Sequence, residues 1–240
     1  MDYGLVEYSE LLISQGIDTL AVSTAEEAIE LKKANLKADI FLLASNCIKS
    51  EVKELIDNDI ILTIGSKKAA EIANELSEGK KVRAHIKIDT GFGRYGFVYN
   101  NSEEIINVYK NYPNLLIEGT FTHFAQAYEK KLKFTKIQFD RFMDVIEVLR
   151  NNKINPGLLH ICNSSAFLKY PYMHLNAARI GSAFIGRILV ENDIGLKRIA
   201  NLETSITEIK DVPKGYNIGY SCTAKTTRET RIAIIPVRIW

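Results

Sequence analysis

The sequence contains few cysteines, and their spacing forms no recognisable pattern. Cys47, Cys162 and Cys222 are odd in number, lie far apart and include no C-x-x-C motif. Disulfide frameworks and cysteine-ligated metals normally need an even or closely spaced set. We therefore expect reduced thiols, with Cys162 buried as a structural residue, and no metal site.

The chain also lacks a strong net charge and long apolar runs. Its formal net charge is +2, and its lysines are scattered along predicted helices. The basic cluster Lys225, Arg228 and Arg231 is interpreted as a solvated loop. A nucleic-acid surface requires a concentrated basic patch. A membrane span or signal peptide requires an apolar stretch that this sequence does not contain. These absences predict a cytoplasmic protein with neither a nucleic-acid nor a membrane partner.

A third absence concerns nucleotide binding. No G-x-G-x-x-G motif follows an early strand, so a dinucleotide-binding fold lacks its fingerprint. What the sequence does contain is an alternation of short apolar runs with helical patterns. Strict alternation predicts a parallel sheet with right-handed crossovers. The seven predicted strands are residues 20–23, 40–45, 60–64, 84–89, 117–124, 158–163 and 177–182.

The predicted helices have recognisable starts. Thr24 opens a capping box for a helix to about residue 34, and Ser66 caps a helix to about residue 76. Ser102 heads a third helix, with acidic residues in its first turn. The longest helix covers about residues 131–151. Its stripe of large apolar side chains is interpreted as core and not as a cofactor contact. The stripe consists of Phe139, Phe142, Met143, Ile146 and Leu149.

Seven strands are one short of a closed (β/α)8 barrel, which takes roughly 250 residues. An open doubly wound sheet is the alternative. Candidate site residues follow at least four different strands, as they do in barrels, so we predict a TIM-type barrel lacking its first strand over residues 1–198. In residues 199–240 the strand–helix alternation gives way to strand-like runs, which predict the start of an antiparallel β domain. Strands are expected at 202–209 and 232–237, with a turn at 212–215.

The stretch from residue 83 to residue 97 is the strongest candidate site. In the strand that opens it, His85, Lys87 and Asp89 share one face and apolar residues share the other. A buried strand rarely carries three ionisable groups on one face unless that face lines a site. The glycines that follow allow a sharp turn or a close approach to a ligand. Arg94 among them offers a planar fork for a carboxylate or phenolate oxygen. The pattern alone is equally compatible with a tight turn.

Polar residues also follow three later strands. They are His123, then Asn163, Ser164 and Ser165, and finally Arg179, Gly181 and Ser182. Hydroxyls and backbone N–H groups at a helix start suit a phosphate, although capping alone explains Ser164 or Ser165. Each signal is weak by itself, but all of them converge on one face of a barrel. The spacing of His85, His160 and His174 suggests no metal site.

Four segments match one family in order and spacing. They are K-I-D-T-G-F-G-R-Y-G-F at 87–97, E-G-T-F-T-H-F at 118–124, H-I-C-N-S-S at 160–165 and N-A-A-R-I-G at 176–181. From about residue 5 to residue 237 the chain resembles alanine racemase and its relatives, the fold-type III enzymes that use pyridoxal 5'-phosphate (PLP). The resemblance implies a barrel that binds PLP at its mouth, a following β domain and a head-to-tail homodimer. It also implies interconversion of L- and D-alanine.

The resemblance assigns roles to single residues. Arg94 would contact the substrate carboxylate and the phenolic oxygen of PLP, and Lys87, often carbamylated in the family, would hold Arg94 in place. His123 would hydrogen-bond Arg179, and Arg179 would face the pyridine nitrogen. Because arginine keeps its proton, that nitrogen would stay unprotonated and PLP would be a weaker electron sink. Asn163 would lie beside the ring. The phosphate ligands would be Ser164, Gly181 and Ser182.

Two departures from the family pattern stand out. The family's K-x-x-x-Y-G motif, whose lysine forms a Schiff base with PLP, would lie a few residues before Met1, and Tyr3-Gly4 copies its end only superficially. The family's P-V-G-Y, which supplies a tyrosine base, is replaced by Pro236-Val237-Arg238. One A inserted after a GTA valine codon would convert Val-Gly-Tyr-Gly into Val-Arg-Ile-Trp. We therefore expect a frameshifted gene or one truncated at both ends.

These departures leave three functional hypotheses. The first is an alanine racemase whose chain as given lacks both proton-transfer residues and has little or no activity. The second is a non-catalytic PLP-binding or homeostasis protein, which is weakened because such proteins keep the lysine. The third is a non-functional gene fragment with unpaired strand edges that favour aggregation. Activity, PLP affinity and cooperative unfolding distinguish the three.

Overall fold

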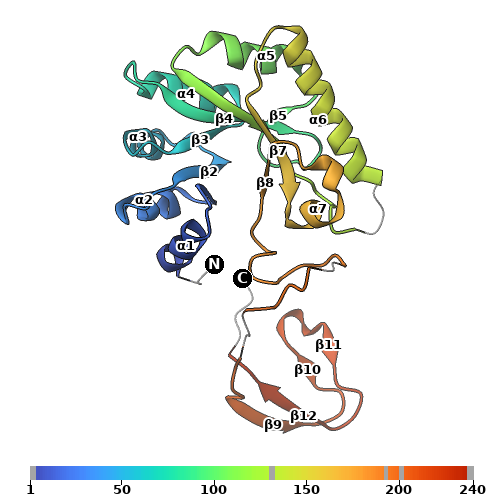
Figure 1. The fold of residues 1–240 in the computed structure, drawn as a ribbon. Coiled ribbons are helices and arrows are strands. Elements are labelled where there is room, and N and C mark those ends of the chain that lie inside the picture. The colour runs from blue at the N-terminus through green and yellow to red at the C-terminus, as the bar shows by residue number, and fades with distance from the viewer. Residues whose placement is uncertain (1–3, 130–132, 192–193, 200–202, 237–240) are drawn as a thin grey trace. The chain divides into compact units, whose positions relative to one another are not determined.

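The computed structural model of the chain describes residues 4–129, 133–191, 194–199 and 203–236. The chain divides into two compact units, a barrel unit (Met1–Lys197) and a β unit (Arg198–Trp240), shown in Figure 1. Several features singled out in the sequence lie outside the described residues, among them the predicted strand start at residue 202. The others are Tyr3, the predicted helix start at residue 131 and the segment from Val237 onward.

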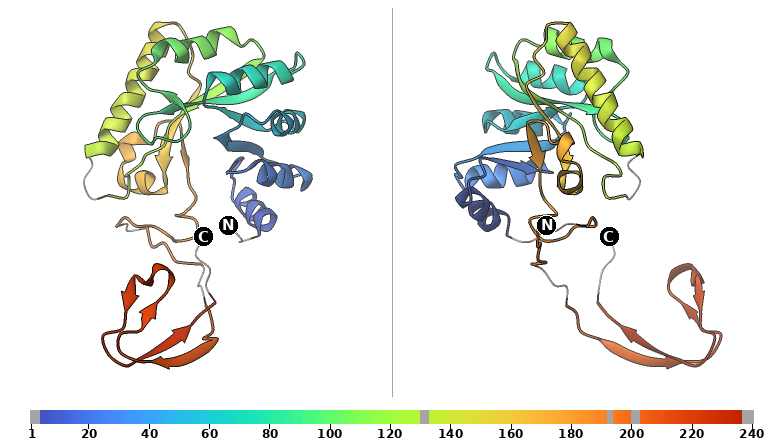
Figure 2. Two further views of the ribbon diagram at one scale, coloured as in Figure 1. Left: turned by 180° about the vertical axis from the view of Figure 1, so that it is seen from behind. Right: turned by 45° about the vertical axis from the view of Figure 1, so that its right-hand side comes forward.

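The barrel unit contains the seven predicted parallel strands in the predicted chain order. The sheet order is β1-β2-β3-β4-β6-β7-β8, and a two-residue strand β5 (Phe97–Val98), which the sequence did not predict, pairs with β4. Helices lie on the outside of this curved sheet (Figures 1 and 2), so the predicted barrel of seven strands is confirmed. The strands are β1 (Thr19–Val22), β2 (Asp39–Ser45), β3 (Ile61–Ile64), β4 (Val82–Asp89), β6 (Leu115–Phe121), β7 (Leu158–Asn163) and β8 (Ala177–Arg179).

Side-chain caps set where several helices begin. Thr24 and Glu27 form the predicted capping box of α2, each side chain accepting a hydrogen bond of 3.2 Å from the other's backbone N–H. Ser66 caps α4 as predicted. The N-cap of α5 is Asn101 and not Ser102, because the Asn101 amide oxygen accepts the third helical N–H at 3.3 Å. The helices are α1 (Leu5–Ser14), α2 (Ala25–Lys33), α3 (Lys49–Asp57), α4 (Lys67–Leu76), α5 (Ser102–Asn111), α6 (Lys133–Asn151), α7 (Ser164–Lys169) and the 3-10 turn η1 (Pro171–Met173).

Two apolar clusters form the core of the barrel unit. The larger one lies between strands and helices and includes the outward face of β4 and the predicted stripe of α6. Its fully buried members there are Ala84, Ile86, Ile88, Phe142, Ile146 and Leu149. The smaller cluster consists of Phe41, Ile61 and Phe121, with Leu43 packed against it. Because side chains alternate along a strand, His85 and Lys87 of β4 face this smaller cluster inside the barrel.

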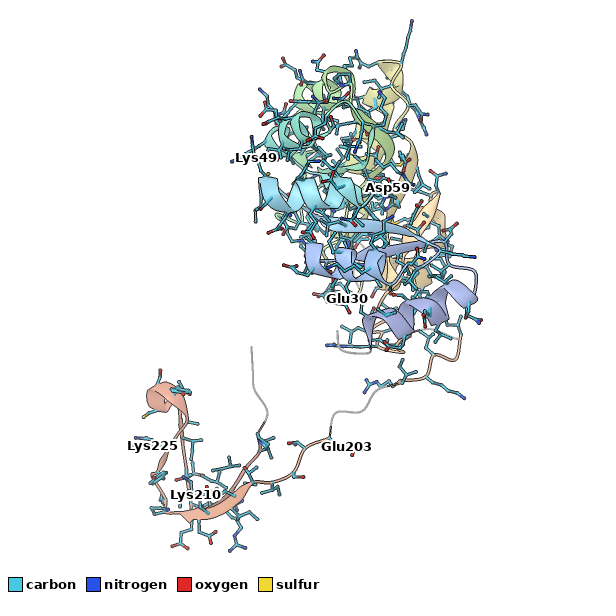
Figure 3. All side chains as sticks on the ribbon, turned by 90° about the vertical axis from the view of Figure 1, so that its left-hand side faces the viewer. Glu30, Lys49, Asp59, Glu203, Lys210 and Lys225 are labelled. Carbon is cyan, nitrogen blue, oxygen red and sulfur yellow. The ribbon has the colours of Figure 1, made fainter. Side chains whose placement is uncertain are left out.

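Cys162 follows the sequence prediction, whereas the predicted basic loop is wrong for two of its three residues. Lys225 lies in β11 (Ala224–Lys225), and Arg231 lies in β12 (Thr230–Ile234), where it pairs with Asp211 at 2.8 Å. Cys162 is fully buried, its thiol donates to the Met173 carbonyl at 3.2 Å, and burial raises its pKa to about 11. It is therefore an inert structural thiol, as predicted. Charged side chains such as Glu30 and Lys49 are exposed on the outer helices (Figure 3). Among the described residues, no helix combines the length and apolarity needed to cross a membrane.

The β unit contains two antiparallel strand pairs. Strand β9 (Glu208–Val212) pairs with β12 (Thr230–Ile234), and β10 (Asn217–Ile218) pairs with β11 (Ala224–Lys225). The predicted strand at 202–209 is wrong for the described residues 203–207, since the strand begins at residue 208 and extends to residue 212; residue 202 lies outside the described residues. The length of β9 is limited by the length of its partner β12. Alternation within one strand does not indicate where its partner ends. Antiparallel pairing itself is confirmed.

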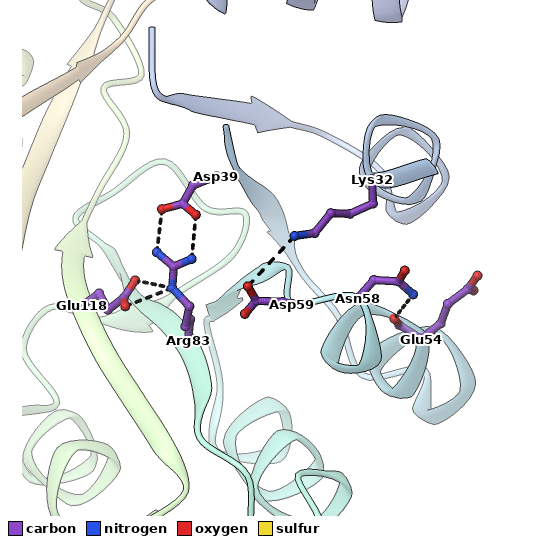
Figure 4. A network of polar contacts seen from close by, with 7 residues as sticks. All are labelled: Lys32, Asp39, Glu54, Asn58, Asp59, Arg83 and Glu118. Carbon is purple, nitrogen blue, oxygen red and sulfur yellow. Dashed lines mark hydrogen bonds and ion pairs between the residues drawn. The ribbon is translucent and has the colours of Figure 1, made fainter. Parts of the chain in front are cut away.

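An ion-pair network lies near the amino ends of three barrel strands (Figure 4). Arg83 of β4 donates two hydrogen bonds of 2.7 and 2.6 Å to the carboxylate of Asp39 in β2, and its Nε donates to Glu118 of β6 at 3.0 Å. The bidentate pair raises the pKa of Arg83 and lowers that of Asp39. One guanidinium therefore ties β2 to β6 at the end of the barrel opposite the candidate site.

Replacing Arg83 tests this network. We expect Arg83→Met to lower the free energy of unfolding by about 1–2 kcal/mol, because two carboxylates lose a half-buried partner that is only partly screened by water. The folded-state pKa of Asp39 is depressed, so its contribution is present above the unfolded value of about 3.9 and is lost as the pH falls through the folded value. The difference between wild type and variant should therefore be constant from pH 7 to pH 5 and shrink below about pH 4.

Urea unfolding followed by circular dichroism measures this difference. The matched control is Lys136→Met, which removes an exposed pair with Asp140 on α6 and should change stability by less than about 0.5 kcal/mol. Equal losses in the two variants, or a difference that grows on acidification, would contradict the assignment.

Candidate active site

The carboxyl ends of neighbouring parallel strands gather most of the predicted site residues. Lys87 lies near the end of β4, His123 two residues after β6, Asn163 at the end of β7 and Arg179 at the end of β8. Because β4, β6, β7 and β8 are adjacent and parallel, their carboxyl ends meet at one edge of the barrel. The ring of Phe121 forms part of the floor, with Lys87 Nζ 4.5 Å and Arg179 Cζ 5.1 Å from its centroid.

The guanidinium of Arg179 is enclosed by acceptors. Its Nη1 donates to His160 Nδ1 at 2.7 Å and to the His160 carbonyl at 3.1 Å. Its Nη2 donates to the carbonyls of Thr122 and Ile161 at 2.7 and 3.3 Å and lies 3.1 Å from His123 Nδ1. Burial lowers the pKa of Arg179 to about 10, which still leaves it charged at neutral pH. The predicted hydrogen bond between His123 and Arg179 is present.

Arg179 determines the protonation of its two histidine partners. Arginine has no acceptor, so both Nδ1 atoms must accept, and His123 and His160 carry their single proton on Nε2. Burial, reinforced by the charges of Arg179, Lys87 and Arg94, lowers the pKa of His123 to about 3. Burial also lowers the pKa of His160. Both imidazoles are therefore neutral over the physiological range.

Lys87 is a buried amine in cationic surroundings. Only 5% of the residue is exposed. Burial first, and then the charges of Arg179 and Arg94, lower its pKa well below the ordinary value, against a smaller opposing effect of Asp89. A larger fraction of Lys87 is consequently present as a neutral, nucleophilic amine than in an exposed lysine.

Asp89 shapes the glycine-rich loop that follows β4. Its Oδ1 accepts the backbone N–H groups of Gly91, Phe92 and Gly93 at 2.9, 2.9 and 3.2 Å, and its Oδ2 also accepts the last at 3.1 Å. Gly96 has φ 123°, and a Cβ there would lie 2.7 Å from the Asp89 backbone nitrogen. The carboxylate is thus occupied by the loop, and the residue at 96 must be glycine for the loop to close.

Arg94 stands apart from the enclosed cluster. It is exposed, and its guanidinium lies 4.4 Å from the centroid of the Phe92 ring, which in turn packs edge-on against His123 at 5.3 Å. A second ring, that of Tyr95, lies 5.9 Å from the same guanidinium. The predicted support of Arg94 by Lys87 stays a prediction. The position leaves its donors free to meet a ligand at the barrel mouth.

The segment after β8 folds back onto the start of α7. Ser164 Oγ accepts the backbone N–H groups of Gly181 and Ala183 at 3.1 and 3.2 Å, which brings the predicted phosphate residues together. Asn163 is the N-cap of α7, its side chain accepting from Ala166 N at 3.0 Å, so capping by Ser164 or Ser165 is wrong. A Cβ at Gly181 would meet nothing within 4 Å, so this position borders open space.

Two parts of the site had no clear signal in the sequence. Gln138 of α6 is fully buried, accepts from Ala125 N at 2.9 Å and donates to the His123 carbonyl at 3.1 Å and Thr90 Oγ1 at 3.2 Å. A polar residue on the apolar face of that helix was the available signal. His85 and His160 pair at 2.8 Å between Nδ1 and Nε2, although 75 positions separate them.

The fold and the site together define a class of protein: a parallel barrel with a cation-rich site at the carboxyl ends of its strands, followed by a β unit. The family profile of the alanine racemase N-terminal domain matches residues 2–188, and that of the alanine racemase C-terminal domain matches residues 199–237. The chain belongs to the alanine racemase family.

Individual relatives agree with this assignment. The chain is 34% identical to the alanine racemase of Methanococcus maripaludis, over 98% of its own length and 65% of the relative's. It is also similar to the crystal structure of Clostridium difficile 630 alanine racemase, with a TM-score of 0.77 and 30% identity over 96% and 62% of the two chains. Alanine racemase of Bacillus anthracis with bound L-Ala-P matches with a TM-score of 0.71 and 28% identity, over 96% and 61%. The chain thus spans just under two thirds of the length of these relatives.

Asp89 provides a test of the loop geometry. We expect Asp89→Ala to speed amide hydrogen exchange at Gly91–Gly93 by about tenfold or more, because three N–H groups lose their acceptors. Asp89→Asn keeps one acceptor oxygen and should lie between wild type and Asp89→Ala. Asp140→Ala on the exposed face of α6 is the control and should leave these amides unchanged. Unchanged exchange in Asp89→Ala would rule out the capping role.

Proposed function

We propose that this chain forms the PLP-binding barrel of an alanine racemase, an isomerase that interconverts L- and D-alanine. The observation that carries the proposal is the enclosed Arg179 guanidinium at the barrel mouth. All five of its acceptor atoms are neutral, so its charge is left for an anionic or electron-rich ligand. Because the chain covers less than two thirds of its relatives, the activity, the alanine substrate and a head-to-tail homodimer all belong to this proposal.

The residues present fit PLP. Its phosphate would be held by the hydroxyls and backbone N–H groups around Ser164, Gly181 and Ser182, beside the open space at Gly181. Asn163 would lie beside the ring, and Arg179 would face the pyridine nitrogen. When bound, PLP supplies an electron sink that weakens the α-C–H bond of an amino acid. Arg179 donates a hydrogen bond but keeps its proton, so it orients the ring without protonating the nitrogen.

Arg94 and Lys87 would serve the substrate side. The exposed guanidinium of Arg94 can receive the carboxylate of alanine and the phenolic oxygen of PLP. As an amine, Lys87 can only repel Arg94 when it is protonated. As a carbamate it would carry a negative charge and attract Arg94, which is how it would hold that arginine in place.

Carbamylation of Lys87 is directly measurable. The neutral amine attacks CO2, a C–N bond forms and one proton is released to water, leaving a carbamate anion. With 13C-bicarbonate at pH 8 we expect one carbamate 13C resonance, because the lowered pKa of Lys87 keeps a fraction of the amine unprotonated. The resonance should disappear in Lys87→Gln and persist in Lys136→Gln, which alters an exposed lysine. Its persistence in Lys87→Gln would refute the proposal for this residue.

Racemisation also needs a proton-transfer group on each face of the substrate. Residues 1–240 contain no K-x-x-x-Y-G motif, and Pro236-Val237 is followed by Arg238 where the family has P-V-G-Y. We therefore expect the 240-residue polypeptide by itself to be weakly active or inactive. Its racemisation rate should be at least about a thousandfold below that of a complete enzyme. The second candidate, PLP binding without catalysis, rests on the cation-rich site around Arg179 and is weakened by the same missing lysine, which PLP homeostasis proteins keep.

Labelling with PLP tests both candidates. The purified chain is mixed with PLP, reduced with borohydride and analysed by mass spectrometry, while affinity is measured by absorbance and D-alanine formation by a coupled assay. We expect saturable PLP binding that inorganic phosphate competes away, scattered labels and negligible racemisation. Arg179→Met should weaken binding by about tenfold or more, whereas Arg150→Met, at the end of α6, should not. Absence of PLP binding would refute both candidates, and a single labelled lysine would refute the loss of the covalent anchor.

A further inference from the structure

We propose that His85 is a positioning residue of this site: it accepts the Nε2–H of His160 and thereby fixes the His160 ring against the guanidinium of Arg179. The geometry stands on the hydrogen bonds of the chain itself. Its functional meaning rests on the proposed function, because it matters for catalysis only if Arg179 meets the cofactor.

The direction of the hydrogen bonds follows from Arg179. Arginine can only donate, so His160 Nδ1, 2.7 Å from Nη1, accepts and the single proton of the neutral ring lies on Nε2. That Nε2 lies 2.8 Å from His85 Nδ1, which must accept in turn. His85 then carries its own proton on Nε2. A chain of hydrogen bonds therefore runs from Arg179 through His160 to His85. His85 provides the acceptor for the Nε2–H of His160.

Aromatic walls make this acceptor hard to replace. Phe121 stacks on His160 with a centroid distance of 4.7 Å and an interplanar angle of 5°, and Phe41 lies 4.7 Å from His85 and 5.8 Å from His160. His85 and His160 are 9% and 3% exposed. With apolar rings on these sides, a lost acceptor is less readily replaced by water than on the surface, and a buried N–H without an acceptor is costly.

The position of the His85 ring depends on a glycine. Gly119 in β6 has no left-handed φ that would call for glycine, but a Cβ built there would lie 2.8 Å from both Nδ1 and Cε1 of His85 and 2.7 Å from the Leu158 carbonyl. Real Cβ contacts essentially never come that close, so the missing side chain makes room for the imidazole. Glycine at position 119 therefore allows the His85 ring to lie where its Nδ1 can accept from His160.

The first experiment needs neither a variant nor PLP. The chain is labelled with 15N-histidine, and two-bond 1H–15N correlations at pH 7.5 report which ring nitrogen of each histidine carries the proton. We expect His160 and His85 as pure Nε2–H tautomers. Protonation of His160 on Nδ1, or an even mixture of tautomers, would overturn the proposal.

Variants then separate the acceptor from packing. In His85→Asn the amide oxygen can take the place of Nδ1, and the His160 shifts should stay close to wild type. In His85→Leu the acceptor is gone, so the Nε2–H of His160 loses its partner and its 1H and 15N shifts should move away from wild type, while Arg179 still donates to Nδ1. Gly119→Ala, which displaces His85, should resemble His85→Leu. The control is His174→Leu, because His174 lies elsewhere, stacked on Phe167. Equal shifts in His85→Asn and His85→Leu would reduce the role of His85 to packing and refute the proposal.

PLP affinity connects the position of the His160 ring to the cofactor site. We expect His85→Leu to weaken PLP binding by about tenfold and His85→Asn by less than about threefold. If wild type binds no PLP, the proposed function fails while the tautomer measurement still decides the role of His85. A loss of affinity in His85→Leu with unchanged His160 shifts would show that His85 acts by another route, and would overturn the inference.

Discussion

The arrangement of the site depends on one constraint: an enclosed guanidinium that keeps its proton needs hydrogen-bond acceptors, here for both of its Nη atoms. Arg179 meets this requirement with two backbone carbonyls of β7, one carbonyl after β6 and two histidines. The carbonyls are available because β8 lies beside β7 and β7 beside β6. The histidines must stay neutral, since a protonated imidazole would offer the guanidinium a donor where it needs an acceptor. The strand order and the protonation states thus follow from the same cation.

Charge is distributed unequally along the barrel. At the amino ends of the strands, Arg83 is neutralised by Asp39 and Glu118. At the carboxyl ends, the carboxylate of Asp89 accepts backbone amides of the glycine-rich loop, and the acceptors around Arg179 are uncharged. The positive charge at the amino ends is therefore balanced by carboxylates, and this network contributes to stability. The second end keeps an excess of positive charge, which favours an anionic ligand and lowers the pKa of any amine nearby.

The sequence predicted the strands of the barrel better than the contacts within its site. Periodicity locates each strand and each face, so the seven strands and the polar face of β4 were predictable. It could not predict that His85 and His160 meet, because that contact depends on curvature and register across β6, including the irregular register between Ala84 and His85. The cap of α7 was missed for a local reason: Asn163 and Ser164 are both good caps, and only the backbone distinguishes them. In the β unit, strand ends depend on the partner strand, which alternation does not report.

Strand β4 shows how position alone assigns different chemistry to similar side chains. Arg83, His85, Lys87 and Asp89 occupy alternate positions on one face and therefore lie at successive depths inside the barrel. Carboxylates beside Arg83 keep it charged. Burial, and then the charges of Arg83 and Arg179, lower the pKa of His85 and keep it neutral. Burial, and then the charges of Arg179 and Arg94, lower the pKa of Lys87 and favour its neutral amine. Asp89, at the strand end, meets backbone amides and fixes a loop. The chemical role of each group is decided by its depth in the barrel, and a one-residue shift in the register of β4 would turn all four side chains to the opposite face at once.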